Sequence, residues 1–529
     1  MPRIRRMPLF LALVCVAVAA AAGCASPSVD RTDRIVLAES QELGGYNPVA
    51  GYGELGVSPL YDGLLRPASD TDTTLPDLVP ALAVAAPAPL GERQWRVQLR
   101  PGVTFSDGSS LDSADVVATY KAVASPMVAS DIATHFRPIT DIRADGTDAV
   151  VVTMANDADP SPHLLLGIAP SERIEQAPVA DWTLNTEPVG TGPYELTSLR
   201  PDQAAFTARD DYWGPSPQVR SLVFTHTPDD NTRAQRIVAG EVDGASLPPG
   251  LLGAVAGREG ITTIGVASAD WRGVSLPRNN SFTADPIART AMNVGLDRQT
   301  MIEDVLAGHG RPASTPVAEV YGDAYDPRAQ FPHDVDSAAA MLDRAGWRMG
   351  TDGVRQKDGS TARFDLLYNA QDSLRRDLST AFAAAMAPLG VEVRTRGTSW
   401  DEIDTRLDTA AVLLGGGETP YSIDSQVYDT LHTRVPDSSP YANPGNLTPP
   451  GVDRLLDEAR SAGRSPDTDA KYREVQQRYI SEPSYVFLAF LDHTYAYRDL
   501  GWNQTAPILE PHSHGVSWGP WWHVAGWTR

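Results

Sequence analysis

The sequence predicts an α/β protein built from several domains, and three observations lead to this fold class. The chain has 529 residues, which is roughly three times the length of an ordinary domain. Hydrophobic residues make up 42% of it and charged residues 21%, as in folded globular proteins. Segments with the two-residue period of strands alternate with segments of helical period, which is the pattern of sheets covered by helices.

The first elements are strands followed by a capped helix. A strand begins at Arg34, and residues 94–99 (QWRVQL) alternate as a half-buried strand. Asp112 is placed to cap a helix that continues through Val123. Residues 148–154 then predict a further strand.

Residues 189–214 contain a Gly-Thr-Gly-Pro corner at 190–193 that could suggest a phosphate-binding loop. Such a loop needs a helix N-terminus after its glycines. Here an alternating run starting at Tyr194 follows instead, turns at Asp202 and resumes. The segment therefore predicts a corner followed by a β-hairpin, and a phosphate site is excluded.

The second half of the chain contains the clearest strand–helix–strand unit. Asp285-Pro286 is a cap-and-proline start for a helix that we expect to run to residue 306. Phe364–Tyr368 alternates as a strand, Ser373–Ala387 has helical spacing, and Val391 begins another alternation. Such a unit implies two parallel strands. Two later helices are expected at residues 452–462 and 467–480.

The N-terminus has the pattern of an export signal. Arg3, Arg5 and Arg6 precede an uncharged apolar run, Leu9–Ala22, of 14 residues. As a helix this run would be about 21 Å long, short of the roughly 30 Å hydrocarbon core. The run ends in Ala-Ala-Gly-Cys24, which resembles a bacterial lipobox and predicts lipidation of Cys24. Simple secretion remains the alternative.

The remaining composition restricts the possible partners. Cleavage after residue 23 removes Cys15, so the mature chain holds one cysteine and forms no internal disulfide. The formal charge is −23, and loss of three arginines with the signal lowers it to −26. A strongly acidic chain has no basic face for phosphates, so nucleic-acid binding is excluded.

Motifs along nearly the whole mature chain resemble those of the family 5 extracellular solute-binding proteins, the peptide- and nickel-type receptors of ABC importers. No single motif is specific, but they occur in the family's order. They are YDGLLR at 61–66, PDLVPAL at 76–82, LRPGVTFSDG at 99–108 with DVV at 115–117, GTGPY at 190–194 with DDYWG at 210–214, PDDNTR at 228–233 with GEVD at 240–243, residues 291–298, AGW at 345–347, residues 452–459 and YRE at 472–474.

The resemblance implies a two-lobed periplasmic-binding-protein-like fold of class II, cluster C type, with an inserted third subdomain. A ligand would be held between the lobes, which close around it. The implied divisions are a signal peptide at 1–23, a lipidated tether at 24–34, lobe I at 35–62, 189–271 and 497–529, an inserted subdomain Ib at 63–188, and lobe II at 272–496.

The resemblance also suggests ligand-binding residues. In the family a first-lobe loop faces the ligand, and here it carries Tyr46, Asn47 and Tyr52. Pro420-Tyr421 matches a Pro-Tyr pair of the nickel-type members, although their metal-binding histidine is not conserved in place. Arg173 is a candidate to hold a ligand carboxylate, and Glu418 and Asp424 are candidates to hold a ligand amine. The alternative is that these are loop charges exposed to solvent.

The C-terminal tail is rich in aromatic and histidine residues. Five of the eleven tryptophans lie in residues 502–529. Glu510 and His512 are further ligand candidates, and His432, His512 and His514 are candidate metal ligands. Packing of the tail against lobe I is the structural alternative.

We therefore expect a monomeric, lipid-anchored solute receptor on the outer face of the cytoplasmic membrane, without a cofactor and without catalysis. Its expected ligand is a short peptide and its expected partners are ABC permease and ATPase subunits. A metal–chelate complex is the alternative ligand. Two further alternatives are a lipoprotein outside transport and a serine hydrolase, the latter because Gly515-Val-Ser517-Trp-Gly519 fits the nucleophile-elbow pattern.

Overall fold

The computed structural model describes residues 33–435, 438–463, 465–513 and 515–529. The predicted signal segment, Cys24 and His514 lie outside these residues. Within the described part of the chain, no helix combines the length and apolar character required to cross a bilayer.

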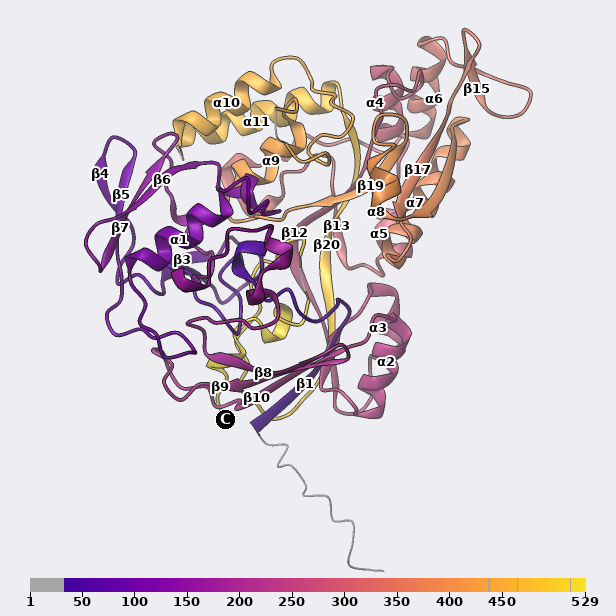
Figure 1. Ribbon diagram of the computed structural model, residues 1–529. Coiled ribbons are helices and arrows are strands. Elements are labelled where there is room, and N and C mark those ends of the chain that lie inside the picture. The colour runs from indigo at the N-terminus through magenta and orange to yellow at the C-terminus, as the bar shows by residue number, and fades with distance from the viewer. Residues whose placement is uncertain (1–32, 436–437, 464, 514) are drawn as a thin grey trace, which may run out of the picture.

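One continuous sheet runs through both lobes and organises the molecule (Figure 1). Among the described residues it has eleven strands, and the short strand β13 (Gly310–Pro312) joins it by pairing with β20. In spatial order the others are β18 (Glu392–Thr398), β17 (Arg363–Asn369), β19 (Ala411–Gly416), β12 (Ile261–Ser275), β20 (Tyr485–Arg498), β11 (Gly244–Ser246), β1 (Arg34–Glu39), β10 (Ser221–His226), β9 (Gln203–Ala208) and β8 (Tyr194–Arg200).

The two long strands β12 and β20 connect the lobes. They pair antiparallel along almost their whole length, with irregular register between Ala267 and Trp271. On one side of this irregularity β20 also pairs with β11 of the first lobe, and on the other side β12 pairs with β19 of the second. Residues 272 and 497, where the family resemblance places the lobe crossings, fall inside these two strands.

The second lobe contains the predicted parallel unit. β17 and β18 are parallel and are connected by α7 (Ser373–Met386), as expected from the sequence. Buried Leu378, Phe382 and Met386 of α7 pack in the core beneath these strands. The other second-lobe helices are α4 (Pro286–Val294), α5 (Arg298–Val305), α6 (Val335–Arg344), α8 (Trp400–Asp404), α9 (Ile423–Leu431), α10 (Val452–Ala462) and α11 (Pro466–Ser481).

The prediction of one helix over 286–306 was wrong. The chain leaves the helix after Val294 and starts α5 at Arg298, because the side chain of Asp297 accepts a hydrogen bond from the Thr300 amide and caps a new N-terminus. Leu296, between the two helices, is buried. The helical spacing of apolar residues continues across the break between α4 and α5, so this spacing alone could not reveal the break.

In the first lobe the predicted corner and hairpin are confirmed. β8 and β9 form the hairpin, and the glycine corner before it lies directly on the backbone of Leu60. A Cβ atom on Gly190 would lie 2.1 Å from the Leu60 carbonyl oxygen, and one on Gly192 would lie 2.4 Å from the Leu60 carbonyl carbon. The glycines therefore serve close backbone packing. Two helices accompany this lobe, α2 (Asp230–Ala239) and α3 (Pro249–Val255).

The inserted part of the chain forms its own small sheet, seen on the left of Figure 1. Helix α1 (Ser113–Val123) packs against its strands β6 and β7, and Asp112 caps the helix as predicted, within a capping box. The sheet strands are, in spatial order, β4 (Ala88–Gly91), β5 (Gln94–Gln98), β7 (Ala149–Met154) and β6 (Ile139–Ala144). Short strands elsewhere are β2 (Leu65–Ala68), β3 (Asp77–Pro80), β14 (Arg348–Met349), β15 (Arg355–Lys357) and β16 (Ser360–Thr361).

Candidate functional site

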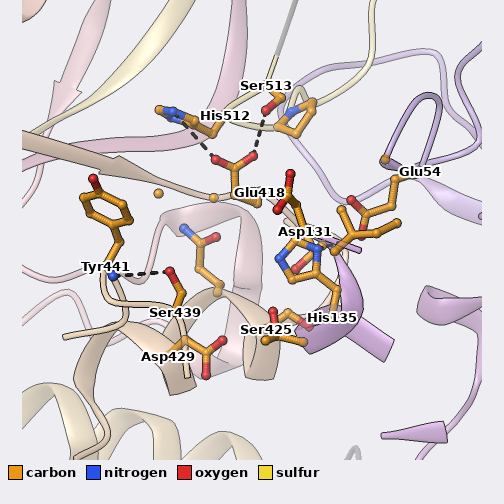
Figure 2. A pocket seen from close by; sticks show the side chains of 18 of the residues that line it. Glu54, Asp131, His135, Glu418, Ser425, Asp429, Ser439, Tyr441, His512 and Ser513 are labelled. Atoms are coloured by element: carbon orange, nitrogen blue, oxygen red, sulfur yellow. Dashed lines mark hydrogen bonds and ion pairs between the residues drawn. The ribbon is translucent and has the colours of Figure 1, made fainter. Parts of the chain in front are cut away.

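A cavity of about 1060 Å³ lies between the lobes. Segments far apart in the sequence line it, among them a first-lobe loop at 50–55, the inserted subdomain around 131–138, the second-lobe segment 414–419 and the tail at 511–513. Figure 2 shows side chains from these parts turned toward one another. This volume slightly exceeds the range of roughly 300–1,000 Å³ that is usual for small-molecule sites.

The second-lobe wall is built where parallel strands end. β17, β18 and β19 run in the same direction, and each is followed by cavity-lining residues. Arg375 follows β17 in the first turn of α7, Trp400 opens α8 after β18, and Glu418 follows β19. Ligands of open α/β sheets bind at such carboxyl ends.

Arg375 is the most buried cation of this wall. Its residue is 7% exposed, and its guanidinium lies 5.0 Å from the centroid of the Trp400 ring. Its Nη2 atom lies 3.4 Å from Nε2 of His512, and its Nε atom 3.4 Å from Asp372. Stacking on an indole holds the guanidinium plane in place for a planar anion such as a carboxylate.

Two acidic side chains of the second lobe, Glu418 and Asp424, line the cavity. Glu418 accepts a hydrogen bond of 2.8 Å from the Ser513 hydroxyl, and its other oxygen lies 3.7 Å from Nε2 of His512 (Figure 2). Asp424 forms an ion pair of 2.8 Å with Arg460.

His135 pairs with Glu54 at 2.7 Å within the cavity wall. Burial opposes its protonation, but Glu54, together with the second-lobe acids Glu418 and Asp429, raises the pKa of His135. The two lobes therefore interact electrostatically across the cavity.

A buried polar network lies at the strand irregularity beside the cavity. Asp270 of β12 contacts Arg272, His512 of the tail at 2.8 Å, and Nε2 of His493 of β20 at 3.1 Å. The other ring nitrogen of His493 lies 2.7 Å from Glu510. The hydroxyl of Tyr495 and the amide of Gly519 also donate to Glu510, each at 2.7 Å.

Neighbouring opposite charges in this network stabilise the charged forms of Asp270 and His493. Burial opposes ionisation of Asp270, yet Arg272 and His512 hold the pKa of that carboxyl well below its usual range. Burial also opposes protonation of His493, but its two carboxylate partners raise the pKa to about 9. Burial raises the pKa of Glu510. His493 is thus an imidazolium at neutral pH, and the network joins β12, β20 and the tail.

Four of the residues suggested by sequence line the cavity: Tyr52, Glu418, Asp424 and His512. Tyr46 and Asn47 are buried beside the loop that lines it, and the Asn47 side chain accepts a hydrogen bond from the Val49 amide.

The remaining candidates lie off the cavity wall. The Tyr421 hydroxyl donates to the Leu509 carbonyl at 3.0 Å. Glu510 is in the buried network, and His432 stacks on Tyr428 with 4.4 Å between ring centroids. Arg173 lies near Asp107 and lowers the pKa of that carboxyl, together with hydrogen bonds from Ser109 that outweigh burial. Ligand contact by these residues stays a prediction.

The described residues contain no group of three or more His, Cys, Asp or Glu side chains arranged to hold a metal ion. Of the two candidate metal ligands in the described residues, His512 lines the cavity, whereas His432 stacks on Tyr428 and does not line it.

Ser517 does not have the surroundings of a nucleophile elbow. It is followed by a single 3-10 turn, Gly519–Trp521, whereas an elbow turns sharply from a strand into a helix that follows the serine.

Sequence reasoning missed several cavity residues, among them Asp131, His135, Trp271, Arg375 and Trp400. Each lies in a segment with no motif of its own. One signal could have found Arg375 and Trp400: both follow the predicted parallel strands of the second lobe, at the edge where α/β proteins bind ligands.

Two lobes joined by a pair of long strands, with a ligand-sized cavity between them, form the architecture of a solute-binding protein. The model of the family "Bacterial extracellular solute-binding proteins, family 5 Middle" matches residues 77–437. The chain belongs to this family.

Individual relatives agree with the family assignment. The chain is 35% identical to Protein XP55 of Streptomyces lividans, over 97% of this chain and 95% of that protein. Among solved structures it is similar to NikZ of Campylobacter jejuni in complex with Ni(L-His), with a TM-score of 0.82, 22% identity, and 94% and 100% of the two chains covered. It is also similar to AppA of Bacillus subtilis in complex with a nonapeptide, with a TM-score of 0.76, 19% identity, and 93% and 98% covered.

Proposed function

We propose that this protein is the solute-binding receptor of an ABC importer and that it captures short peptides between its lobes. The observation that carries the proposal is the interlobe cavity of about 1060 Å³, which has charged groups of both signs on its walls. A peptide is an extended ligand with a carboxylate and an amine, and it needs both kinds of partner.

Arg375 is the proposed partner of the peptide carboxylate, because its buried guanidinium faces the cavity and stacks on Trp400. Glu418 is the proposed partner of the amine, because it lines the cavity and its side chain is 44% exposed. The similarity to AppA, whose structure holds a nonapeptide, supports a peptide ligand.

A metal–chelate complex is the second candidate ligand. The fold similarity to NikZ with Ni(L-His) favours it, and His512 lies on the cavity wall beside Arg375.

The proposal includes the export route and the partners. The apolar run after the N-terminal arginines would direct export, and lipidated Cys24 would anchor the protein outside the cytoplasmic membrane. The mature protein would act as a monomer, without chemistry of its own, and deliver its ligand to ABC permease and ATPase subunits.

Native mass spectrometry of the 25–529 fragment, purified without chelators, tests the proposal together with metal analysis of the same sample. We expect a series of bound masses that match short peptides, with no stoichiometric metal. A single small adduct containing nickel or another transition metal would instead establish the chelate as the ligand.

A further inference from the structure

The cavity contains more acidic than basic side chains. Among the described residues that line it are seven carboxylates, three arginines and two histidines. The carboxylates are Glu39, Glu54, Asp131, Asp404, Glu418, Asp424 and Asp429.

Several of these carboxylates are already compensated within the protein. Asp424 is paired with Arg460, and Glu54 with His135. Glu39 accepts hydrogen bonds from three backbone amides, those of Ser40, Gln41 and Val516. Asp404 accepts from the Tyr441 hydroxyl.

Three carboxylates remain without a cation as close partner. Among the described residues, Asp131 and Asp429 form no ion pair or hydrogen bond through their side chains. Glu418 accepts from a serine hydroxyl and is 3.7 Å from the His512 ring. All three are exposed to the cavity.

These three groups come from opposite sides of the cavity. Asp131 belongs to the inserted subdomain, four residues before His135, while Glu418 and Asp429 belong to the second lobe (Figure 2). Lobe closure concentrates their charges in one space, and like charges in a partly desolvated site repel one another. A cation between them would convert this repulsion into attraction and would favour the closed form.

The cations of the cavity do not fill this role. His135 is held by Glu54 at 2.7 Å, Arg460 is paired with Asp424, and Arg137 is also engaged. Arg375 lies at the His512 end and stacks on Trp400, where it suits a ligand carboxylate. The acidic excess is therefore left for the ligand to balance.

We infer that the cavity selects peptides that carry a basic side chain: with Glu418 holding the peptide amine as proposed above, Asp131 and Asp429 form the subsite for the cationic side chain. This inference builds on the proposed peptide function and adds the charge class of the ligand. Asp131 and Asp429 act as specificity-determining residues, because a neutral peptide does not need them.

The test is a competition experiment followed by native mass spectrometry. The 25–529 fragment is freed of ligand and offered equimolar mixtures of tri- to pentapeptides that differ only in one central residue: lysine, glutamine or glutamate. We expect the lysine peptides to be bound at least tenfold in excess over the glutamine peptides, with the glutamate peptides weakest. Raised salt should reduce the preference.

Asp131→Asn and Asp429→Asn should each lower the lysine-over-glutamine ratio at least threefold. Asp304→Asn is the matched control, because Asp304 is exposed on α5 and does not line the cavity. Equal binding of the three peptide sets would overturn the inference and leave the peptide receptor intact. Binding of no peptide, with retention of a metal–amino acid adduct, would overturn the proposed function as well.

Discussion

At the scale of single residues, Gly192 permits a close contact between two backbone segments because glycine has no Cβ atom. The Gly192 amide donates to the Leu60 carbonyl at 2.9 Å, so the two backbones touch just before the hairpin begins. A glycine pair that looks like an anion site in sequence is used here for close packing.

Substitution of Gly192 by alanine should lower the free energy of unfolding by about 2 kcal/mol, because the new methyl group overlaps backbone atoms that cannot move aside. Urea denaturation measures the change. Gly250→Ala is the control: a Cβ there meets nothing within 4 Å and the residue lies in α3, so stability should be unchanged or slightly higher. Equal effects of the two substitutions would contradict the packing argument.

His493 also acts as a single residue, since its imidazolium bridges Asp270 and Glu510. Replacement by glutamine should destabilise the fold by about 3 kcal/mol, because two buried carboxylates lose their shared cation. His333→Gln, at an exposed histidine, should have little effect.

The raised pKa of His493 predicts a pH dependence of stability. Because the folded-state pKa is about 9 and the ordinary value is about 6.5, its stabilising contribution is complete below about pH 6.5 and is lost as the pH rises through about 9. Denaturation curves from pH 6 to 10 should show this decline in the wild type and a weaker one in His493→Gln. Parallel curves would show that His493 is neutral in the folded protein.

At the scale of elements, helix caps divide the second lobe into separate helices. The apolar period of residues 286–306 suits one helix, but α4 ends at Val294 and the Asp297 cap starts a second helix at Arg298. Local capping chemistry therefore outweighs a continuous hydrophobic pattern.

The α5 cap gives a direct prediction. Asp297→Ala should reduce stability by about 1 kcal/mol, because the first turn of α5 loses its side-chain acceptor and the Asp297 contact with His333 is weak and exposed. Thermal denaturation measures the loss, and Asp297→Asn or Asp297→Ser should recover most of it. No recovery by either would assign the effect to charge rather than to capping.

At the scale of the whole molecule, ligand binding and stability are linked. Arg375 belongs to the second lobe and His512 to the tail that returns along the first, and they meet in the cavity. A ligand that binds only the folded protein stabilises it by an amount that grows with the logarithm of its concentration relative to its dissociation constant.

Arg375→Gln should weaken peptide binding by about 2 kcal/mol, or about thirtyfold, because a desolvated carboxylate loses its cationic partner. Calorimetric titration with a peptide identified by mass spectrometry measures this change. Arg376→Gln is the matched control, since that neighbouring side chain is 56% exposed and pairs with Asp377. If both variants bind alike, Arg375 is not the carboxylate partner. The melting temperature of the free proteins shows whether either change disturbs the fold.

Much of the fold could be predicted from local patterns. The capped helix after Asp112, the hairpin after Gly192 and the parallel unit around α7 were all readable from spacing, because each is determined by neighbours in sequence. The order of motifs also identified the family.

The candidate site could be predicted only in part. Glu418 could be named because it flanks the Pro420-Tyr421 pair that the resemblance singled out, and His512 because the tail is rich in tryptophan and histidine; both line the cavity. Arg375 and Asp131 lie in segments without a motif. The burial of Glu510 beside His493 depends on the meeting of β12, β20 and the tail, which are far apart in the sequence.

The sequence by itself thus determined the α/β class, the caps and hairpins, the acidic charge and the membership of the family, because these depend on residue type and short-range spacing. Only the tertiary structure decided which charges face one another. Asp131 and Asp429 are 298 residues apart in the chain and lie on the same cavity because two long strands carry the chain to the second lobe and back. Electrostatic energy depends on distance in space and on burial, and neither can be read from position along the chain.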